Sequence, residues 1–375
     1  MPPQKIAFIR MGSYSHINAP LMDALARAYP DFQVVPIDLE RDLVRKKSLP
    51  ALAWALLEYG PDLVSGKKEW REELHAREIL TRTPYFFQQV KTRAARRLKR
   101  EEFSFSFQTQ SLYDASLPGL PHFVYTDHTH LANLRYPDFD RRKLYSQRWI
   151  RLEQSIYANA AAVLTTSNFA RQSVIEDYDC PPDKVFCVYS GVQVDAHLPP
   201  ERKDYTGKHI LFVGKEWERK GGPDLAAAFE LVLQAHPDAR LTIIGRGPGL
   251  RHPQISEVGI LPLAELRRYY QEATIFCMPS RVEPSAQVFA EACAYGLPVV
   301  STNIGGTPDR VLDEQTGLLV APGDVRGLAR ALIRLLADPD ECAAFGQAGQ
   351  QLSLERFRWE RVGARMKAAI DQSLD

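Results

Sequence analysis

The sequence has little cysteine and no obvious pairing pattern for it. Five cysteines occur in 375 residues, an odd number, and they are widely spread along the chain. Disulfide frameworks use an even set of cysteines and zinc sites use clustered ones, so both are disfavoured. We therefore expect buried, reduced thiols in a cytosolic protein. The cysteines are Cys180, Cys187, Cys277, Cys293 and Cys342.

Long apolar runs and an excess of charge of one sign are also missing. The longest apolar stretches, 49–57 and 158–166, are shorter than the about 20 residues that cross a bilayer. The first residues lack the apolar stretch of a secretory signal. The formal net charge of +1 gives no overall attraction to nucleic acid or to a membrane. These absences favour a cytoplasmic globular protein without a nucleic-acid partner.

Short β-rich runs alternate with longer helical patterns along the whole chain. Apolar residues recur at helical spacing in 224–236 and 325–338, for example. Strands that are separated by helices form parallel sheets covered on both faces. The expected strands are 5–9, 33–37, 103–107, 122–126, 161–167 and 185–190 in the first half, and 209–214, 241–245, 257–261, 274–280, 297–302 and 317–321 in the second.

The two series of strands predict an α/β protein with two doubly wound Rossmann-like domains that face each other across a cleft. A polar stretch at 197–208 has the composition of a linker. We therefore predict a first domain over 1–196, a second over 209–356, and a last helix over 357–375 that packs back on the first domain. Ligands of such sheets bind beyond the carboxyl ends of the strands.

Basic residues and glycines follow the expected strand 209–214. Lys215 and Lys220 flank a short loop, and Gly221 and Gly222 then lead into a helix that opens with proline. Two lysines at a strand end suit a diphosphate, whose charge they would neutralise. A solvated basic loop would show the same pattern, so this segment alone leaves both interpretations open.

Two glutamates eight positions apart follow the expected strand 274–280. Pro284 and Ser285 suit the first turn of a helix, which would place Glu283 in the loop and Glu291 in the second turn. A fully helical stretch would separate the pair by roughly 12 Å. That exceeds the about 5–9.5 Å between the two carboxyl groups of a glycosidase. The spacing suits a grip on both ends of an extended ligand, and an ordinary solvated face is the alternative.

These segments together resemble the retaining glycosyltransferases with two Rossmann-like domains (GT-B fold), and specifically the large family 4. The stretch 283–291 is similar to the E-x7-E motif of that family, and 213–221 resembles its phosphate-binding loop. The stretch 125–130 resembles its histidine-bearing loop. The ordered set, strongest over 155–340, is more specific than any one piece. The other segments that carry the resemblance are 157–175, 188–195, 303–309 and 316–324.

The resemblance implies a nucleoside-diphosphate sugar as the donor substrate. Glu291 would bind the ribose hydroxyls, and Glu283 the hydroxyls of the donor sugar. Lys220 would hold the diphosphate with Lys215 beside it, and His128 would lie near the bond that breaks. The implied catalytic residues are thus His128, Glu283 and Lys220. The further positions implied to contact the donor are Gly12, Ser13, Gly245, Val258, Gly259, Ile260, Leu261, Ser285, Ala286, Gln287 and Val288.

The chain departs from the family pattern at several points. Lys215 stands where arginine is usual, and a lysine lacks the bidentate geometry for phosphate. Residues 284–286 replace a usual Gly-Phe-Gly or Phe-Gly, which leaves the identity of the donor sugar open. In the histidine-bearing loop His130 is a rival to His128, which we prefer for its spacing from the strand.

The activity implied by the resemblance is hexosyl transfer to an acceptor hydroxyl with retained anomeric configuration. No carboxylate is clearly placed as a nucleophile, so attack from the front face is favoured. We expect no metal and no bound cofactor, because the D-x-D triplets at 138–140 and 177–179 do not directly follow strands. The alternatives are a sugar-nucleotide epimerase on the same fold, a phosphorylase-like enzyme, and an inactive GT-B protein that binds a partner.

The segment 91–100 carries six basic residues in ten. Three interpretations are open for it, namely a solvated helix, peripheral contact with the inner face of an anionic membrane, and binding of an acidic acceptor. The acceptor itself stays open as a glycan, a lipid or a small molecule.

Overall fold

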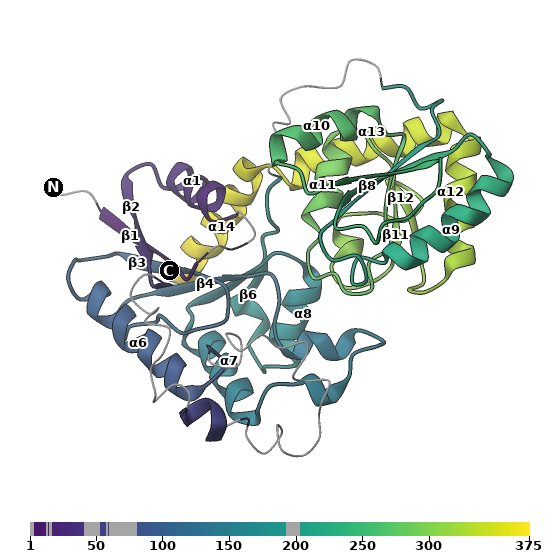
Figure 1. The fold of residues 1–375 in the computed structure, drawn as a ribbon. Coiled ribbons are helices and arrows are strands. Elements are labelled where there is room, and N and C mark those ends of the chain that lie inside the picture. Colours follow the sequence, from purple (N-terminus) through teal and green to yellow (C-terminus); the bar gives the residue numbers. More distant parts are fainter. Residues whose placement is uncertain are drawn as a thin grey trace. The chain divides into compact units, whose positions relative to one another are not determined.

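The residues placed by the computed structural model are 4–12, 14, 17–40, 53–57, 59, 81–192 and 203–375. The chain divides into two compact units (Figure 1). One comprises Met1–Tyr189 with Val362–Asp375, and the other comprises Ser190–Arg361. The boundaries expected from the sequence lay at 196 and 357. The first part of the expected linker, 197–202, lies outside the described residues.

The first unit contains a parallel sheet whose strands are β1 (Gln4–Arg10), β2 (Phe32–Asp38), β3 (Phe105–Thr109), β4 (His122–Thr126), β5 (Ala162–Thr165) and β6 (Val185–Cys187). Their order across the sheet is β2-β1-β3-β4-β5-β6. Every residue of β3 and of β4 is buried. β4 is apolar over Phe123–Tyr125, as expected for a strand covered on both faces. β3 alternates instead, and its buried polar residues Ser106 and Gln108 are hydrogen-bonded to His122 and to the Tyr113 carbonyl.

Helices cover both faces of this sheet. Figure 1 shows α1 (Asn18–Ala28) and α14 (Trp359–Leu374) on one face, and α6 (Pro84–Leu98) and α7 (Gln147–Asn159) on the other. α6 begins where Thr83 Oγ1 accepts a hydrogen bond from the amide of Phe86 and Pro84 fills the first turn. A further helix, α8 (Asn168–Glu176), follows β5.

The second unit is built around one doubly wound parallel sheet. Its order is β12-β11-β10-β7-β8-β9. α9 packs with α12, and α11 packs with α13. The strands are β7 (His209–Gly214), β8 (Arg240–Gly245), β9 (Ile255–Gly259), β10 (Ile275–Met278), β11 (Val299–Thr302) and β12 (Gly317–Val320). The helices are α9 (Gly222–Ala235), α10 (Leu263–Glu272), α11 (Gln287–Ala294), α12 (Val325–Ala337) and α13 (Pro339–Arg356).

The two parallel sheets confirm the predicted fold class. The expected strand ends were less accurate, since 185–190 is a strand only over Val185–Cys187. Cys180, Cys277, Cys293 and Cys342 are buried thiols, as expected, whereas Cys187 is only half-buried. Within the described part of the chain, no helix is both long and apolar enough to cross a membrane.

Candidate functional site

The candidate site of the second unit lies where its sheet changes winding direction. β7 pairs in parallel with β10, and the chain winds outward from this pair in opposite directions. The crevice beyond the carboxyl ends at such a switch point is where open α/β sheets bind ligands. The loop after β7 carries Lys215 and Lys220, and the loop after β10 carries Glu283. The fold thus brings two separately predicted motifs to one edge.

Lys220 and Glu283 form a buried ion pair at this edge. Lys220 Nζ lies 2.5 Å from Glu283 Oε2, and the two side chains are only 14% and 5% exposed. Ser280 Oγ donates to the same oxygen at 3.4 Å. Burial alone would raise the pKa of Glu283, but the charge and hydrogen bond of Lys220 outweigh it and hold that pKa below its usual range. Glu283 is therefore an anion at neutral pH.

Gly221 makes this meeting of the two loops possible. It has a φ of 72° and caps the start of α9. A Cβ there would lie 1.8 Å from the carbonyl oxygen of Pro279, at the end of the β10 segment. Only glycine permits both the left-handed backbone and the close approach. The position next to Lys220 is thus fixed by backbone packing.

Gly245, one of the predicted donor contacts, also has a packing reason to be glycine. It ends β8 with a φ of 130°, and a Cβ would lie 1.8 Å from the carbonyl oxygen of Gly214 in β7. The glycine is therefore explained by the contact between adjacent strands. Lys215, directly after β7, has an exposed side chain.

The helix after Glu283 starts later than the sequence suggested. The prediction that Pro284 and Ser285 open it is wrong, because α11 begins at Gln287 and Ala286 has a non-helical φ of −29° and ψ of 92°. The carbonyl of Glu283 accepts from the Gly306 amide at 2.8 Å, which holds the preceding segment as a loop. The 12 Å separation that a continuous helix would give consequently does not apply.

Glu291 lies in the second turn of α11 and is 5% exposed. The hydroxyl of Tyr270, from α10, donates to Glu291 Oε2 at 3.0 Å. The Tyr270 ring stacks on that of Tyr295 at a centroid distance of 5.2 Å, which fixes its direction. Burial raises the pKa of Glu291, and the hydrogen bond from Tyr270 opposes that rise only in part. Glu291 is buried like Glu283, but the partner described here is a neutral hydroxyl.

Arg310 is a functional candidate that the sequence analysis did not single out. Its side chain is completely buried next to the predicted donor contacts Ser285 and Gln287. A guanidinium nitrogen donates to Ser285 Oγ at 3.3 Å and to Ser190 Oγ at 2.7 Å. Gln287 Nε2 donates to the same Ser190 oxygen at 2.5 Å. Arg310 directly follows the short 3-10 helix Thr307–Asp309, and no local pattern marks it as buried.

The remaining predicted contacts of the second unit lie next to the start of α11 and at the end of the edge strand β9. Ala286 is buried and Val288 packs against the core of the unit. Val258 and Gly259 end the edge strand β9, and Leu261 lies just beyond it. Ile260, between them, is 54% exposed.

In the first unit, His128 follows the carboxyl end of β4. His128 Nε2 lies 3.2 Å from Asn133 Oδ1, and its half-buried ring stacks on Phe169 at a centroid distance of 6.3 Å. Gly12 follows β1, and its carbonyl accepts from the side chain of Asn18 at 2.9 Å. Ser13 lies outside the described residues. Because all strands of this sheet run parallel, His128 and Gly12 both lie beyond the carboxyl ends of the strands.

His130, the rival histidine, has a structural environment. Its Nε2 accepts the Tyr145 amide at 2.7 Å, and its ring stacks on Tyr145 at a centroid distance of 4.0 Å. Burial, with the nearby His128 and Arg82, lowers the pKa of His130 to about 3. His130 is therefore neutral and engaged in packing, which favours His128 as the reactive member of the loop.

A buried glutamate holds the histidine-bearing loop. Both carboxylate oxygens of Glu153, in α7, accept from the His130 amide, at 3.1 and 3.2 Å. The hydroxyls of Tyr157 and Tyr178 also donate to Glu153. Burial raises the pKa of Glu153 to about 7, against the opposing hydrogen bonds. Sequence analysis missed this residue because a glutamate in an amphipathic helix is ordinarily a surface residue.

Both D-x-D triplets are engaged with arginine. Asp140 accepts from the backbone and side chain of Arg142, both at 2.8 Å. Asp177 pairs with Arg135 at 3.1 Å. Across the described residues, no group of three or more His, Cys, Asp or Glu side chains could hold a metal ion.

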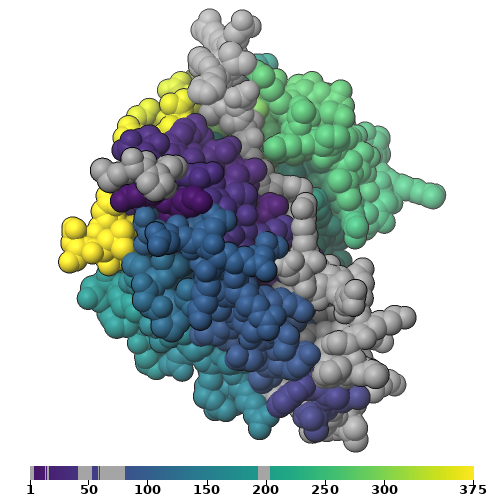
Figure 2. Space-filling model, turned by 90° about the vertical axis from the view of Figure 1, so that its left-hand side faces the viewer, coloured from purple at the N-terminus to yellow at the C-terminus, as the bar shows by residue number. Residues whose placement is uncertain are grey.

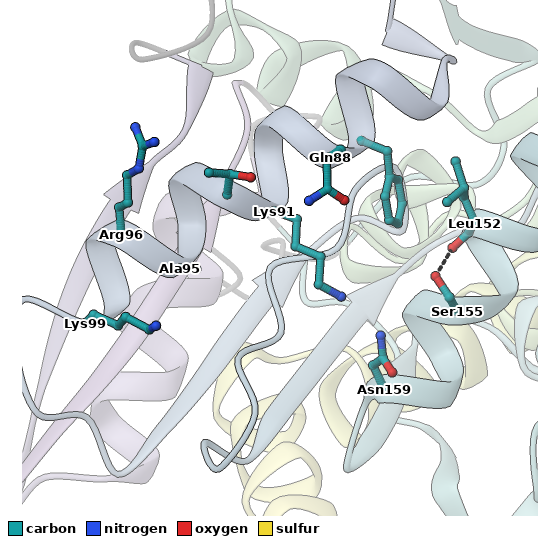
Figure 3. A pocket seen from close by; sticks show the side chains of 10 residues that line it. Gln88, Lys91, Ala95, Arg96, Lys99, Leu152, Ser155 and Asn159 are labelled. Carbon is teal, nitrogen blue, oxygen red and sulfur yellow. Dashed lines mark hydrogen bonds between the residues drawn. The ribbon is translucent and has the colours of Figure 1, made fainter.

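The basic segment 91–100 lies on α6 and just beyond it. A cavity of about 600 Å³ lies between α6 and α7, lined among others by Lys91, Arg96, Lys99 and Asn159 (Figure 3). Lys91 forms an ion pair with Asp114, with 2.5 Å between Nζ and Oδ2. The side chains of Arg96 and Lys99 are exposed. In Figure 2 the blue atoms of the first unit lie on the surface that faces the viewer.

Two family models match the chain, one in each half of the sequence. The model "Glycosyltransferase Family 4" matches residues 60–196, and the model "Glycosyl transferases group 1" matches residues 207–338. A GDP-mannose-dependent alpha-(1-6)-phosphatidylinositol monomannoside mannosyltransferase from Mycolicibacterium smegmatis is 37% identical over 166 residues, which is 40% of this chain and 44% of the relative.

Two further likenesses cover more of the chain. A D-inositol 3-phosphate glycosyltransferase from Corynebacterium urealyticum is 30% identical over 275 residues, 65% of this chain and 64% of the relative. Sucrose-phosphate synthase from Thermosynechococcus elongatus shares the fold with a TM-score of 0.69 at 21% identity, over 98% of both chains. The chain thus spans between 44% and 64% of the length of the two curated relatives.

Proposed function

Because the chain belongs to glycosyltransferase family 4, we propose that it transfers a hexosyl group from a nucleoside-diphosphate sugar to an acceptor hydroxyl. In this proposal the anomeric configuration is retained and no metal takes part. The family matches are to glycosyltransferases, so the epimerase alternative is not proposed.

The buried Lys220–Glu283 pair is the observation that carries this proposal. It puts an ammonium and a carboxylate 2.5 Å apart at the switch point of the sheet. A nucleotide sugar offers matching chemistry, since its diphosphate is an anion next to a ring of hydroxyls. Lys220 would take the diphosphate, and Glu283 would accept hydrogen bonds from the sugar. Glu291, in the helix that follows, would take the ribose hydroxyls.

The proposed transfer needs neither a metal nor a nucleophile from the enzyme, because the donor and the acceptor account for every bond and for the proton. The bond between the anomeric carbon and the diphosphate oxygen breaks, and its electron pair stays on that oxygen. The acceptor oxygen bonds to the same face of the carbon, and the acceptor proton passes to the departing phosphate oxygen. Lys220 and Lys215 stabilise the developing negative charge. Glu283 is held by Lys220 and suits hydroxyl binding rather than attack.

His128 is proposed to contact the donor sugar beside the bond that breaks. Its partner Asn133 and the stacked Phe169 orient the ring. The pKa of the neighbouring His130 is about 3, so that ring carries no charge that would compete for the diphosphate.

A donor panel tests the proposal. GDP-mannose, UDP-glucose and ADP-glucose are added separately, and the melting temperature is measured. We expect one nucleotide to raise it, by the equivalent of about 2.7 kcal/mol at a hundredfold excess over Kd. GDP-mannose is the first donor to test because the relative from Mycolicibacterium smegmatis is named for it. If no nucleotide sugar shifts the melting temperature, the proposed function is wrong.

A His128→Ala variant tests the catalytic assignment with the donor that binds. We expect an unchanged melting shift but a turnover of that donor slower by about a hundredfold, the range of a lost polar contact in a transition state. His236→Ala, at the far end of α9, is the matched control. Normal turnover in the His128 variant would contradict its role. Mass spectrometry of products formed with a cell extract identifies the acceptor.

A further inference from the structure

Arg310 connects three segments of the second unit that are far apart in the sequence. One is the loop Ser285–Gln287, where the donor sugar is proposed to bind. The others are residues 190–192, with which this unit begins, and residues 357–361, with which it ends. The chain passes between the units directly before Ser190 and directly after Arg361. We call 190–192 and 357–361 the connecting segments.

The guanidinium of Arg310 contacts all three. Its Nη1 donates to the Ser190 carbonyl at 3.1 Å, and Nη2 donates to Ser190 Oγ at 2.7 Å and to Ser285 Oγ at 3.3 Å. Its flat face lies 4.2 Å from the centre of the Phe357 ring. A planar group with several fixed donors can make these contacts at once, and a lysine ammonium cannot.

The two connecting segments are also bound to each other. The Val192 amide donates to the Phe357 carbonyl at 2.7 Å. Gly191 lies so close to Trp359 that a Cβ would be 2.3 Å from the indole. A displacement of Ser190 is therefore transmitted to the segment around Phe357, and Arg310 lies against both.

Gln287 provides a second link from the donor loop to Ser190. Its Nε2 donates to Ser190 Oγ, so this hydroxyl oxygen accepts from Gln287 and Arg310 together and both of its lone pairs are used. Gln287 Oε1 is buried, and no described residue donates to it. A hydroxyl of the donor sugar could donate a hydrogen bond to this oxygen. Such a contact would change the position of Gln287 and, through it, of the Ser190 hydroxyl that Arg310 also binds.

We propose that Arg310 is a positioning residue that couples donor-sugar binding at Ser285–Gln287 to the two connecting segments. The coupling rests on the proposed function, because it needs a nucleotide sugar in the site. The sugar part of the donor acts on the Ser285–Gln287 loop, whereas the nucleoside part is held by Glu291. Arg310 therefore affects the response to a nucleotide sugar and leaves the response to a nucleoside diphosphate unchanged.

Hydrogen exchange measured by mass spectrometry tests this, with GDP-mannose against GDP, or UDP-glucose against UDP, whichever pair binds. In the wild-type chain we expect the nucleotide sugar to protect amides 285–292 and both connecting segments, and the diphosphate alone to protect far less of the connecting segments. In Arg310→Met, which replaces the buried charge by an apolar chain, protection of the connecting segments is lost. Kd for the nucleotide sugar rises about tenfold, and Kd for the diphosphate stays unchanged.

Two variants separate coupling from folding. Ser285→Ala removes one oxygen and leaves Arg310 on Ser190 and Phe357, so it should weaken the same protection without unfolding the chain. Arg334→Met removes an exposed arginine of the same unit, paired with Glu314 and Glu341, and should behave as wild type.

The outcomes distinguish the two proposals. If the wild-type chain binds no nucleotide sugar, the proposed function fails. If the wild type binds but Arg310→Met or Ser285→Ala keeps full protection of the connecting segments, the coupling is wrong. Equal losses of affinity for the nucleotide sugar and for the diphosphate would also overturn it.

Discussion

Glu283 in the second unit and Glu153 in the first are both buried glutamates next to a candidate functional residue, yet their pKa values move in opposite directions. Burial disfavours the charge of both. Glu283 has Lys220 at 2.5 Å, and its pKa lies below the usual range. Glu153 receives hydrogen bonds from tyrosine hydroxyls and the His130 amide, and its pKa is raised to about 7.

The opposite pKa shifts distinguish Glu283, which is proposed to bind a ligand, from Glu153, which holds a loop. Glu283 keeps its charge because the ammonium of Lys220 compensates it. Lys220 is also the residue that is proposed to bind the diphosphate. Glu153 needs no charge, because a protonated or ionised carboxyl accepts hydrogen bonds from the loop in either state. A buried acid is therefore better understood from its partner than from its depth.

Of the substitutions considered, Lys220→Ala should have the largest effect, because it removes the cation that distinguishes Glu283 from Glu153. It leaves Glu283 buried without its cation, so we expect a loss of about 3–5 kcal/mol in the free energy of unfolding at pH 7. The pKa of Glu283 should rise above its usual range, as that of Glu153 does. Urea denaturation measures the stability, and turnover of the bound donor should fall by at least about a hundredfold.

Two controls accompany this variant. Lys208→Ala removes a lysine from an exposed pair with Asp238, which should change stability by less than about 1 kcal/mol. Lys220→Met combined with Glu283→Gln should recover most of the stability without the activity. A single Lys220→Ala variant as stable as the wild type would refute the electrostatic account.

Glu153→Gln should remove a pH dependence of the opposite sign from that of Glu283. The pKa of Glu153 is raised from 4.5 to about 7 in the folded chain. Its stabilising contribution is therefore complete below pH 4.5 and is lost as the pH rises to 7, a change of about 3 kcal/mol. For Glu283, whose pKa is lowered, stability is present above pH 4.5 and is lost as the pH falls.

Urea denaturation between pH 5 and pH 8 measures this difference. The wild-type chain should lose stability across this range through Glu153, and the Glu153→Gln variant should lose less. Glu283→Gln is the matched control, because it removes a buried carboxylate whose pKa is shifted the other way. Identical pH profiles for wild type and Glu153→Gln would show that the raised pKa of Glu153 is wrong.

Glu291→Ala tests whether the third buried glutamate binds a ligand, as proposed for Glu283, or only supports the structure, as Glu153 does. Glu291 has a raised pKa and a tyrosine donor, as Glu153 has, but it is proposed to bind the ribose. We expect Kd for the nucleoside diphosphate to rise by about 10–100-fold, the equivalent of one or two lost hydrogen bonds to a charged group. Calorimetric titration measures it. Unchanged affinity would place Glu291 with Glu153 as a structural residue.

Tyr270→Phe should have the smallest effect. It removes the hydroxyl that holds Glu291 Oε2 and leaves the stacking on Tyr295 in place. Kd for the diphosphate should rise by less than about tenfold, and the pKa of Glu291 should rise further, since the lost hydrogen bond had lowered it. An effect as large as that of Glu291→Ala would mean that Tyr270 contacts the ligand itself.

Features that depend on neighbours in the sequence were predictable. The alternation of strands and helices gave both sheets, because apolar spacing reports local periodicity. The loops after β7 and β10 marked Lys220 and Glu283 as candidate residues beyond strand ends, and the spacing of the two glutamates marked Glu291 in the helix that follows. The start of α11 was predicted wrongly, because Pro284 and Ser285 suit a helix start but the segment is held by a backbone hydrogen bond to Gly306.

The sequence by itself determined which residues stand at the ends of parallel strands, since a strand pattern and the residue after it are local. Only the tertiary structure decided which of them meet. Lys220 and Glu283 are 63 positions apart and come together because β7 and β10 are neighbours. Arg310 reaches Ser190 across 120 positions. Pairing, burial and the resulting pKa shifts depend on sheet order and packing, which no short stretch of sequence contains.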